Sequence, residues 1–374
     1  MRKLRASRDE DALAQFVLDR YLHVRRGESL TIESWSQALP WARPFVVAAR
    51  RRGVHPTLVV EDEGAFFRSL EASGSRSVLR TRRTANDFSD AQVYLGGPEE
   101  FSRLLGLPAD DLEALTDRGD GAWWPSARGP HTRSVRLAVA DATLPAATRY
   151  GVDAASWTAE LLRASLVDPE QIARSGHRLL RSLGRRRRLR VRHPNGSELR
   201  LERGPGLPEV ASGPPPATPG SGWGQAPSGL LILPLRADVA EGSWESNRPA
   251  YDRFADPPLA LGGRFEFRGG RLEEFSFDRG GERFASAYGR AGRGRDRPTA
   301  LTIGLNPEIS QAPEVLEYGA GTVGLLLGDS PRRRGFRRSG FSFLATLAEA
   351  DVEADERPWL RAEAPPARLR RRTR

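Results

Sequence analysis

Apolar residues in the first half of the chain recur alternately with helical and with strand spacing. A spacing of three or four positions separates Leu13, Phe16, Val17 and Tyr21, which predicts a helix over residues 9–24. Further helices are predicted at residues 41–52, 66–70 and 101–105, and short apolar runs predict strands at residues 30–32, 57–60, 91–95 and 135–139. Strands that alternate with helices indicate a parallel, wound sheet. We therefore expect an α/β amino-terminal domain.

A second helical pattern joins the two halves of the chain. Its apolar positions extend over residues 157–183, and Pro169 is expected to interrupt it because proline lacks the backbone donor that a helix interior needs. After it, apolar and polar positions alternate in residues 189–192 and 198–201, and Asn195-Gly196 predicts a type I′ hairpin turn between these two segments. Gly269-Gly270 joins a second alternating pair. These patterns predict a mainly antiparallel β (α+β) carboxy-terminal domain.

The boundaries expected from these patterns divide the chain into three parts. Residues 1–184 form the α/β domain, residues 185–360 form the β-rich domain, and residues 361–374 form a disordered basic tail. Within the second part, residues 204–229 are rich in proline, glycine and serine, a composition typical of a mobile loop. A length of 374 residues is sufficient for two domains that each bury a core.

The chain is strongly positive, and arginine carries nearly all of the positive charge. The net charge is +10 and the sequence pI is about 10.8, with Lys3 the only lysine. Such a surface favours acidic partners, but the charge is spread along the chain and no known motif organises it for nucleic acid. Cysteine is absent, which excludes disulfides and thiolate zinc sites. No apolar segment resembles a signal peptide or a membrane span, so we expect a cytoplasmic protein without membrane contact.

Three patterns suggest chemistry but have simpler explanations. Residues 319–324 match GxGxxG, yet an apolar run follows them, which favours a glycine-rich turn before a core strand over a dinucleotide site. The arginine runs at residues 185–188 and 332–334 are interpreted as a solvated helix end and a solvated loop, with a phosphate-binding patch as the alternative for each. No histidine has a second one at i+3 or i+4, so no metal site is expected among His23, His55, His131, His177 and His193.

Three glycine-rich and apolar stretches follow one another in the second half. They are residues 300–306 (ALTIGLN), 321–328 (GTVGLLLG) and 339–344 (SGFSFL). Together they resemble the carboxy-terminal half of the aminopeptidase T-type metallopeptidases, and residues 24–33 and 166–201 are similar to that family's opening strand, domain junction and first hairpin. The resemblance implies a peptidase fold with a two-metal site, and a homodimer.

The positions that match the metal ligands of the resembled family hold poor ligands in this chain. The family's two glutamates, its histidine, its tyrosine and the ends of its final His-Trp-Asp correspond in order to Leu230, Ala300, Gly324, Pro331, Ser342 and Leu344. Leucine, alanine, glycine and proline side chains have no lone pair, and a neutral serine hydroxyl is a weak ligand. The resemblance therefore implies a pseudo-metallopeptidase with no catalytic residue, metal or other cofactor.

The expected function is non-catalytic peptide binding in the cleft that these positions line. Metal-free proteins of this kind are similar to accessory proteins of ribosomal peptide natural-product (RiPP) pathways, which hold a precursor peptide while other enzymes act. We expect such a peptide, preferentially an acidic one, as the partner of a homodimer. Two alternatives stay open. One is an enzyme with a metal-independent site in the same cleft, around Glu273, Glu274 or Asp329, and the other is an arginine-rich nucleic-acid binder.

Overall fold

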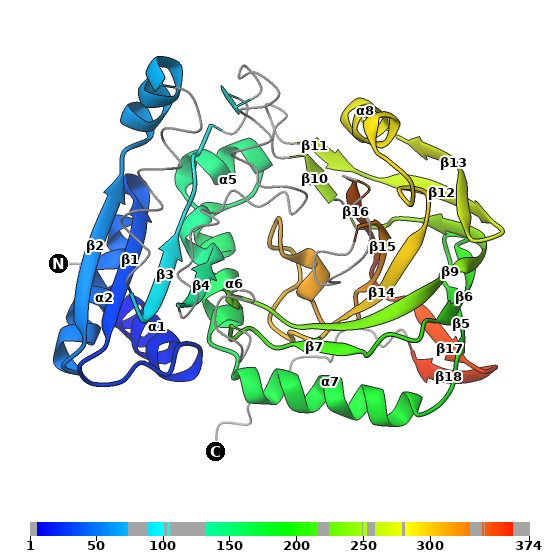
Figure 1. Cartoon of the computed structure of the whole chain (residues 1–374), viewed down its shortest axis with the longest axis horizontal. Helices are drawn as coiled ribbons and strands as arrows, with labels where there is room; N and C mark the ends of the chain where they lie inside the picture. The colour runs from blue at the N-terminus through cyan, green and yellow to red at the C-terminus, as the bar shows by residue number, and fades with distance from the viewer. Residues whose placement is uncertain are drawn as a thin grey trace.

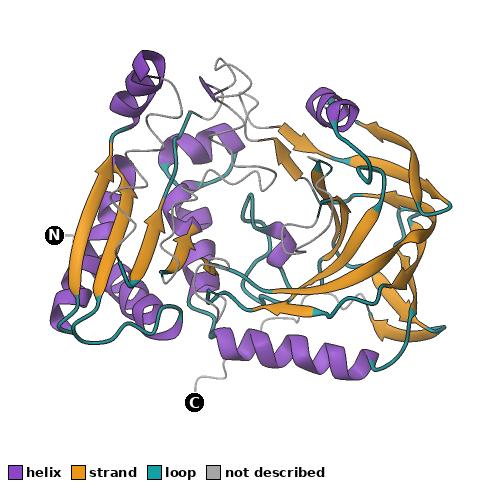
Figure 2. Ribbon diagram, viewed as in Figure 1, coloured by secondary structure: helices purple, strands orange, loops and turns teal. Residues whose placement is uncertain are grey.

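The protein consists of two bodies of different architecture that lie side by side in a computed structural model (Figure 1, Figure 2). A parallel sheet with helices forms the amino-terminal body, and a large antiparallel sheet forms the carboxy-terminal body. This is the α/β plus antiparallel β fold that the sequence predicts. No helix in the described part of the chain is long and apolar enough to cross a membrane. The structure describes residues 6–73, 89–100, 103–104, 132–215, 224–248, 250–252, 259–278, 281–329, 339 and 341–361.

The amino-terminal sheet has the strand order β2-β1-β3-β4-β8, with every neighbouring pair parallel. Its strands are β1 (Ser29–Trp35), β2 (His55–Glu61), β3 (Ala91–Leu95), β4 (Arg133–Leu137) and β8 (Gly224–Ala226). The helical elements of this body are α1 (Ala6–Arg20), η1 (Ser36–Ala38), α2 (Leu39–Arg51), η3 (Ala138–Asp141), α5 (Leu144–Tyr150) and α6 (Ala154–Ser165). Residues 63–73 are also helical and include the predicted segment 66–70, whereas most of the helix predicted at residues 101–105 lies outside the described residues.

The predicted helical stripe is the face by which α1 packs on the sheet. Leu13, Val17 and Tyr21 are at most 1% exposed and share a core with Phe45 of α2. The helix ends at Arg20, four residues earlier than predicted, because the chain turns there and the N–H groups of Tyr21 and Leu22 both reach back to the carbonyl of Val17. Burial of this stripe against the sheet stabilises the helix more than its own propensity does.

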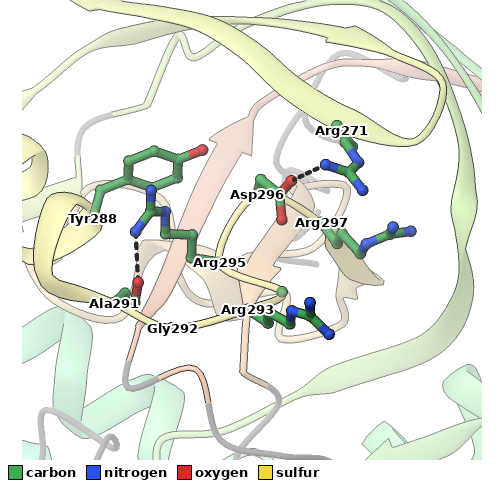
Figure 3. A pocket seen from close by; sticks show the side chains of 9 residues that line it. Arg271, Tyr288, Ala291, Gly292, Arg293, Arg295, Asp296 and Arg297 are labelled. Atoms are coloured by element: carbon green, nitrogen blue, oxygen red, sulfur yellow. Dashed lines mark hydrogen bonds and ion pairs between the residues drawn. The ribbon is translucent and has the colours of Figure 1, made fainter.

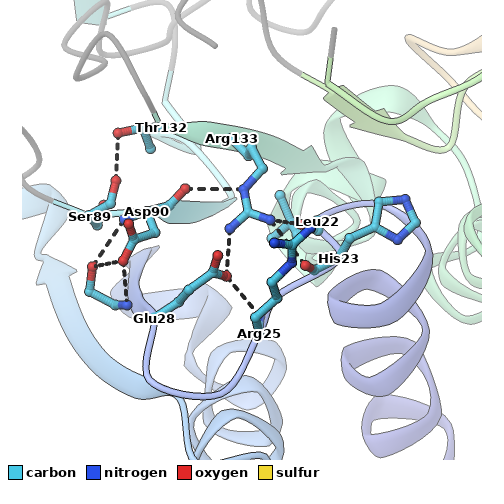
Figure 4. Close-up of polar contacts among 9 residues, drawn as sticks. Leu22, His23, Arg25, Glu28, Ser89, Asp90, Thr132 and Arg133 are labelled. Carbon is cyan, nitrogen blue, oxygen red and sulfur yellow. Dashed lines mark hydrogen bonds and ion pairs between the residues drawn. The ribbon is translucent and has the colours of Figure 1, made fainter. Parts of the chain in front are cut away.

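A polar network holds the amino ends of three parallel strands together (Figure 4). Nη2 of Arg133 donates to Oε2 of Glu28 at 2.6 Å, and its Nη1 donates to the carbonyl of Leu22 at 2.6 Å. Oδ2 of Asp90 accepts from the backbone N–H and from the hydroxyl of Ser29, each at 2.8 Å. The loop after α1 and the first residues of β1, β3 and β4 are thereby fixed to one another.

Two helices take the place of the long helical pattern, and proline separates them as predicted. The first is α6, and the second is α7 (Pro169–Leu183). Each begins with an aspartate whose carboxylate accepts a backbone N–H of the first turn, from Ser156 to Asp153 at 2.8 Å and from Glu170 to Asp168 at 3.0 Å. Pro169 occupies the first turn of α7, where its missing N–H costs nothing.

The carboxy-terminal body is built on one long antiparallel path, β16-β15-β14-β9-β6-β5-β17-β18, with β12, β13 and β7 attached beside it. Its centre is β9 (Leu230–Glu245), which pairs with β14 through its first residues and with β6 and β12 through its last. The other elements are β5 (Arg188–Arg192), β6 (Glu198–Arg203), β7 (Glu209–Ala211), β10 (Ala250–Asp252), β11 (Leu259–Leu261), β12 (Gly263–Arg268), β13 (Arg271–Phe277), α8 (Glu282–Arg290), β14 (Pro298–Gly304), η4 (Leu316–Tyr318), β15 (Val323–Gly328), β16 (Ser342–Leu347), β17 (Asp351–Ala354) and β18 (Arg357–Leu360).

Both predicted hairpins form, but the first has a different turn from the one expected. Gly196 has a φ of +97° whereas Asn195 is not among the residues with positive φ, so the type I′ assignment is wrong. Arg192 pairs with Glu198 and the N–H of Gly196 donates to the carbonyl of His193, which makes a type I turn followed by a left-handed glycine. In the second hairpin, Gly269 and Gly270 both have positive φ, at +54° and +77°, as a type I′ turn requires.

Two segments of the second half enter the first body. The predicted mobile loop 204–229 contains β7 and β8, and β8 adds a fifth parallel strand next to β4, while residues 216–223 lie outside the described residues. The loop that follows β14 contributes Ile309, Ala312 and Val315 to the first core. The domain boundary at residue 184 stays a prediction. The two segments described above follow this residue in the sequence but belong to the amino-terminal body in space. Of the predicted disordered tail, residues 362–374 also lie outside the described residues.

Candidate functional site

Five of the six positions expected to correspond to lost metal ligands share one face of the antiparallel sheet. Directly opposed residues of antiparallel strands lie on the same face, as do residues two apart on one strand. The register opposes Leu230 to Gly304, Ala300 to Pro234 and Leu326, Gly324 to Thr302 and Thr346, Leu344 to Leu326, and Ser342 to Gly328. The sixth position, Pro331, lies outside the described residues. We call this surface of β9, β14, β15 and β16 the site face.

The opposite face of the same four strands is the core of the carboxy-terminal body. Leu231, Leu233, Leu301, Ile303 and Leu325 alternate with the site-face residues, and each is at most 1% exposed. Strict alternation of this kind fixes the register, because a shift by one residue would expose all of these side chains. The core therefore determines which residues the site face presents.

One row across the site face is apolar. It contains Pro234, Ala300, Leu326 and Leu344, taken from β9, β14, β15 and β16 in that order. Ala300 is 2% exposed. None of these four side chains carries an atom that ligates a metal or exchanges a proton, so this row is limited to apolar contact.

The next row contains an isoleucine, a glycine and two threonines, and a charged residue lies at its end. It contains Ile232, Thr302, Gly324 and Thr346, and the bridge between Thr346 and Arg248 extends it by one residue. A β-carbon on Gly324 would lie closer to Oγ1 of Thr302 than non-bonded atoms can approach, and 2.9 Å from Cδ1 of Leu344. Neighbouring side chains thus fill the space that a side chain at position 324 would occupy.

Arg248 is the charged residue of this row, and its side chain is partly buried. Its Nη1 donates to the carbonyl of Leu316 in η4 at 3.5 Å, which is a long hydrogen bond, and no other described residue accepts from its guanidinium. Burial lowers the pKa of Arg248, and the carboxylates of Glu160 and Glu349 act in the opposite direction. An arginine side chain keeps its positive charge in proteins even when it is partly buried. The site face therefore combines apolar and small side chains with one partly desolvated cation.

The segment that carries η4 is fixed by two buried polar residues. Oε1 of Glu160 in α6 accepts three successive backbone N–H groups, from Ser310, Gln311 and Ala312, at 2.6, 2.8 and 3.0 Å. Asn306 is fully buried, and its Nδ2 donates to the carbonyls of Ala164 and Ser228 at 3.0 and 2.9 Å. These bonds tie the end of β14 to α6 and to the turn before β9. The carbonyl that Arg248 contacts is thereby positioned from both bodies.

The other sequence candidates do not converge on the site face. Glu273 and Glu274 are exposed on β13, and Oδ1 of Asp329 accepts the N–H of Ser339 at 2.6 Å. His23, His55 and His177 are exposed, His131 lies outside the described residues, and Nδ1 of His193 accepts the N–H of Asn195 at 3.1 Å. Within the described part of the chain no three His, Asp or Glu residues are grouped to hold a metal ion.

The glycine-rich and arginine-rich patterns have structural roles where the structure describes them. Residues 319–322 form the turn before β15, which is the arrangement we favoured over a dinucleotide site. At the end of α7, Nη2 of Arg186 donates to the carbonyl of Ser182 at 2.6 Å, and Arg203 donates to the carbonyl of Gly184 at 3.0 Å. Of the first arginine run, Arg186 therefore contacts the helix end as we expected. Residues 332–334 lie outside the described residues.

Two solved structures have a similar fold. AmpT from Thermus thermophilus, an aminopeptidase T, is 16% identical to this chain, with a TM-score of 0.68 over 95% of this chain and 98% of that chain. The 2,5-dihydroxypyridine dioxygenase from Pseudomonas putida KT2440 is 15% identical, with a TM-score of 0.58 over 95% and 96%. The chain has an aminopeptidase T-like fold. No family model matches the sequence, and no curated protein matches it.

The resemblance to a metallopeptidase is therefore confirmed for the fold. The side chains of the site face do not fit a metal, because its two rows supply aliphatic carbons, a glycine, two threonine hydroxyls and an arginine. Neutral hydroxyls are weak ligands and a guanidinium repels a cation. Arg248 is the site-face residue that the sequence did not single out. It lies outside the regular strands, in a short polar segment without any pattern, and only its pairing with Thr346 reveals its position.

Proposed function

We propose that this chain is a cytoplasmic, non-catalytic peptide-binding protein that uses an aminopeptidase-derived fold to hold a precursor peptide in ribosomal peptide natural-product biosynthesis. The bound segment is preferentially acidic and lies against the site face. Assembly as a homodimer belongs to the same proposal and rests on the resembled family; sedimentation analysis of the purified protein tests it.

The composition of the site face is the observation that supports this proposal. Apolar side chains at Leu230, Leu326 and Leu344 suit the side chains of a peptide, while the threonine hydroxyls of the same face suit its polar groups. Arg248 adds a partly buried guanidinium, whose planar fork matches a carboxylate. These side chains can contribute to the affinity for a peptide, but they do not form a catalytic group. Such a site suits a protein that binds its ligand without changing it.

The metal-independent enzyme has less support than peptide binding. It would need an acid or base beside the site face, and two of the three carboxylates considered, Glu273 and Glu274, point to solvent from β13. Asp329 already accepts a backbone N–H. Nucleic-acid binding has no organising motif in the described elements, and Arg186 and Arg203 donate to carbonyls at the carboxy-terminal end of α7.

Titration of labelled peptides tests the proposal. Acidic and basic peptides of equal length are added to the protein, to Arg248→Gln and to Arg357→Gln, and fluorescence anisotropy gives each affinity. Arg357 is an exposed arginine on β18, so its variant is a control with the same change in net charge. We expect the acidic peptide to bind more tightly, and Arg248→Gln to weaken it about tenfold, because a hydrogen bond to a charged group contributes about 1.5–3 kcal/mol. Equal affinities for both peptides, or equal losses in both variants, would contradict the proposal.

A further inference from the structure

A pocket of about 750 Å³ lies at the amino-terminal end of β14 (Figure 3). Its lining comes from the first residue of β13, the end of α8 and the loop that joins α8 to β14. Four arginines and one carboxylate line it, together with an aromatic ring: Arg271, Arg293, Arg295, Arg297, Asp296 and Tyr288. The lining is thus strongly positive, and its volume is that of a small-molecule site.

One of these guanidinium groups is fixed in place by the end of α8. Nη1 of Arg295 donates to the carbonyls of Ala291 and Gly289, at 2.5 and 3.2 Å. The guanidinium carbon also lies 4.8 Å from the centre of the Tyr288 ring, within the range of a cation–π contact. A cation held from two sides loses little freedom when an anion binds to its remaining donors.

The single carboxylate neutralises this charge only weakly. Oδ2 of Asp296 is 3.8 Å from Nη1 of Arg271, whose side chain is 58% exposed. Arg293 is exposed, and no described residue accepts a hydrogen bond from its guanidinium. Among the described residues, no backbone carbonyl accepts the N–H groups of residues 293–296 either. Several donors at this pocket are therefore available to a ligand.

We propose that this pocket binds a small phosphate-bearing ligand. Arg293 and Arg295 lie at alternate positions of one short loop and line this pocket together with Arg271, and a compact polyanion can contact more than one of these guanidinium groups at once. The fork of a guanidinium matches two phosphate oxygens. Neighbouring same-face carboxylates of an extended acidic peptide are roughly 7 Å apart and carry one charge each, so a peptide matches fewer arginines. This inference concerns a site separate from the site face and does not depend on peptide binding.

Calorimetric titration with pyrophosphate tests the inference, with orthophosphate and citrate as comparison anions. We expect one saturable pyrophosphate site per chain, with tighter binding than citrate. Arg293→Gln should weaken pyrophosphate binding about tenfold, because a charge-assisted contact contributes about 1.5–3 kcal/mol. Arg293→Lys keeps the charge but loses the fork, and we expect it to bind less tightly than the unmodified protein.

Two control variants separate this site from general attraction of anions. Arg357→Gln removes the same charge elsewhere on the surface, and Arg248→Gln removes the cation of the site face. We expect both to bind pyrophosphate as the unmodified protein does. The proposal is overturned if Arg293→Gln and Arg357→Gln bind pyrophosphate equally, if citrate binds as tightly as pyrophosphate, or if no saturable binding is found. Thermal unfolding of each variant verifies that it is folded.

Discussion

Oγ1 of Thr302 lies too close to the β-carbon position of residue 324 for any side chain to fit there, so the packing of Thr302 requires glycine at position 324. The two residues are directly opposed on β15 and β14. Cδ1 of Leu344 closes the same space from β16, 2.9 Å from the position of a β-carbon. The site face is therefore packed around a glycine, and a substitution of Gly324 by histidine meets a steric barrier whether or not a metal is present.

Gly324→Ala should destabilise the fold by about 1–3 kcal/mol, the usual cost of overpacking. In a Thr302→Ala background the same change should cost less, because the opposing hydroxyl is absent. Urea unfolding of the two single variants and the double variant measures this coupling. Gly289→Ala is the matched control, since it lies in α8 with nothing near its β-carbon position and should be neutral or stabilising by up to about 1 kcal/mol. Additive effects of Gly324→Ala and Thr302→Ala would refute the packing argument.

The purified protein should contain no stoichiometric zinc, manganese or iron, and restoring one ligand should not change this. Leu230→Glu returns a single carboxylate beside Gly304 on a largely apolar face. A lone carboxylate there should be protonated more readily instead of recruiting metal, with a loss of about 1–3 kcal/mol in stability. Elemental analysis and an aminopeptidase assay check the variant and the unmodified protein. About one bound metal ion per chain, or metal-dependent cleavage by either protein, would show that a working site exists.

Glu160→Gln should destabilise the protein by about 1.5–3 kcal/mol. The carboxylate accepts three backbone N–H groups from residues 310–312 through one oxygen, and an amide oxygen replaces it without the negative charge. Glu170→Gln is the control, because that carboxylate is 71% exposed and, among the described residues, pairs only with Arg174 on the same helix. We expect its effect to stay within about 0.5 kcal/mol. If urea unfolding shows that Glu160→Gln and Glu170→Gln lose the same free energy of unfolding, Glu160 does not join the two bodies as we infer.

We expect Asp90 to make the free energy of unfolding decrease at acidic pH. Hydrogen bonds from the backbone N–H and the hydroxyl of Ser29 hold the pKa of Asp90 below its ordinary value of 3.8. A carboxylate with a lowered pKa in the folded state stabilises the fold above its unfolded pKa, and this contribution is lost as pH falls through the folded pKa. The unfolding free energy of the unmodified protein should therefore exceed that of Asp90→Asn at pH 7, and the gap should narrow below about pH 4. Ser29→Ala removes one donor and should show a smaller pH dependence. A constant gap between pH 7 and pH 3 would exclude this linkage.

The regular elements were predictable because local spacing determines them. The stripe that contains Leu13 and Val17 buries one face of α1, and Pro169 separates two helices because of its own backbone chemistry. The turn at Asn195 was not predictable in the same way. Its type depends on which residues pair. Arg192 pairs with Glu198, and the N–H of His193 donates to the carbonyl of Ser197, so three residues are left for the turn instead of two.

Long-range pairing determines the parts that sequence patterns could not predict. A strand of three residues, such as β8, has too few positions to show a period, and its place beside β4 depends on a partner about ninety residues earlier. For the site face, the resemblance named five positions that the register brings onto one surface. The filled space at Gly324 and the cation at Arg248 depend on neighbours across strands, which a single sequence does not reveal.

Salt should distinguish the role of Arg248 from that of the many exposed arginines. The Debye length falls from about 10 Å at 0.1 M salt to about 3 Å at 1 M, so attraction between an acidic peptide and distant surface charges is largely screened at high salt. A contact with a partly buried guanidinium is screened less. We therefore expect the affinity of an acidic peptide to fall with salt to a residual value in the unmodified protein. In Arg248→Gln the residual affinity at 1 M salt should be at least about tenfold lower, whereas Arg357→Gln should retain it. Anisotropy titrations across this salt range measure both. If the affinities of the three proteins converge at 1 M salt, Arg248 contributes only long-range attraction and does not contact the peptide.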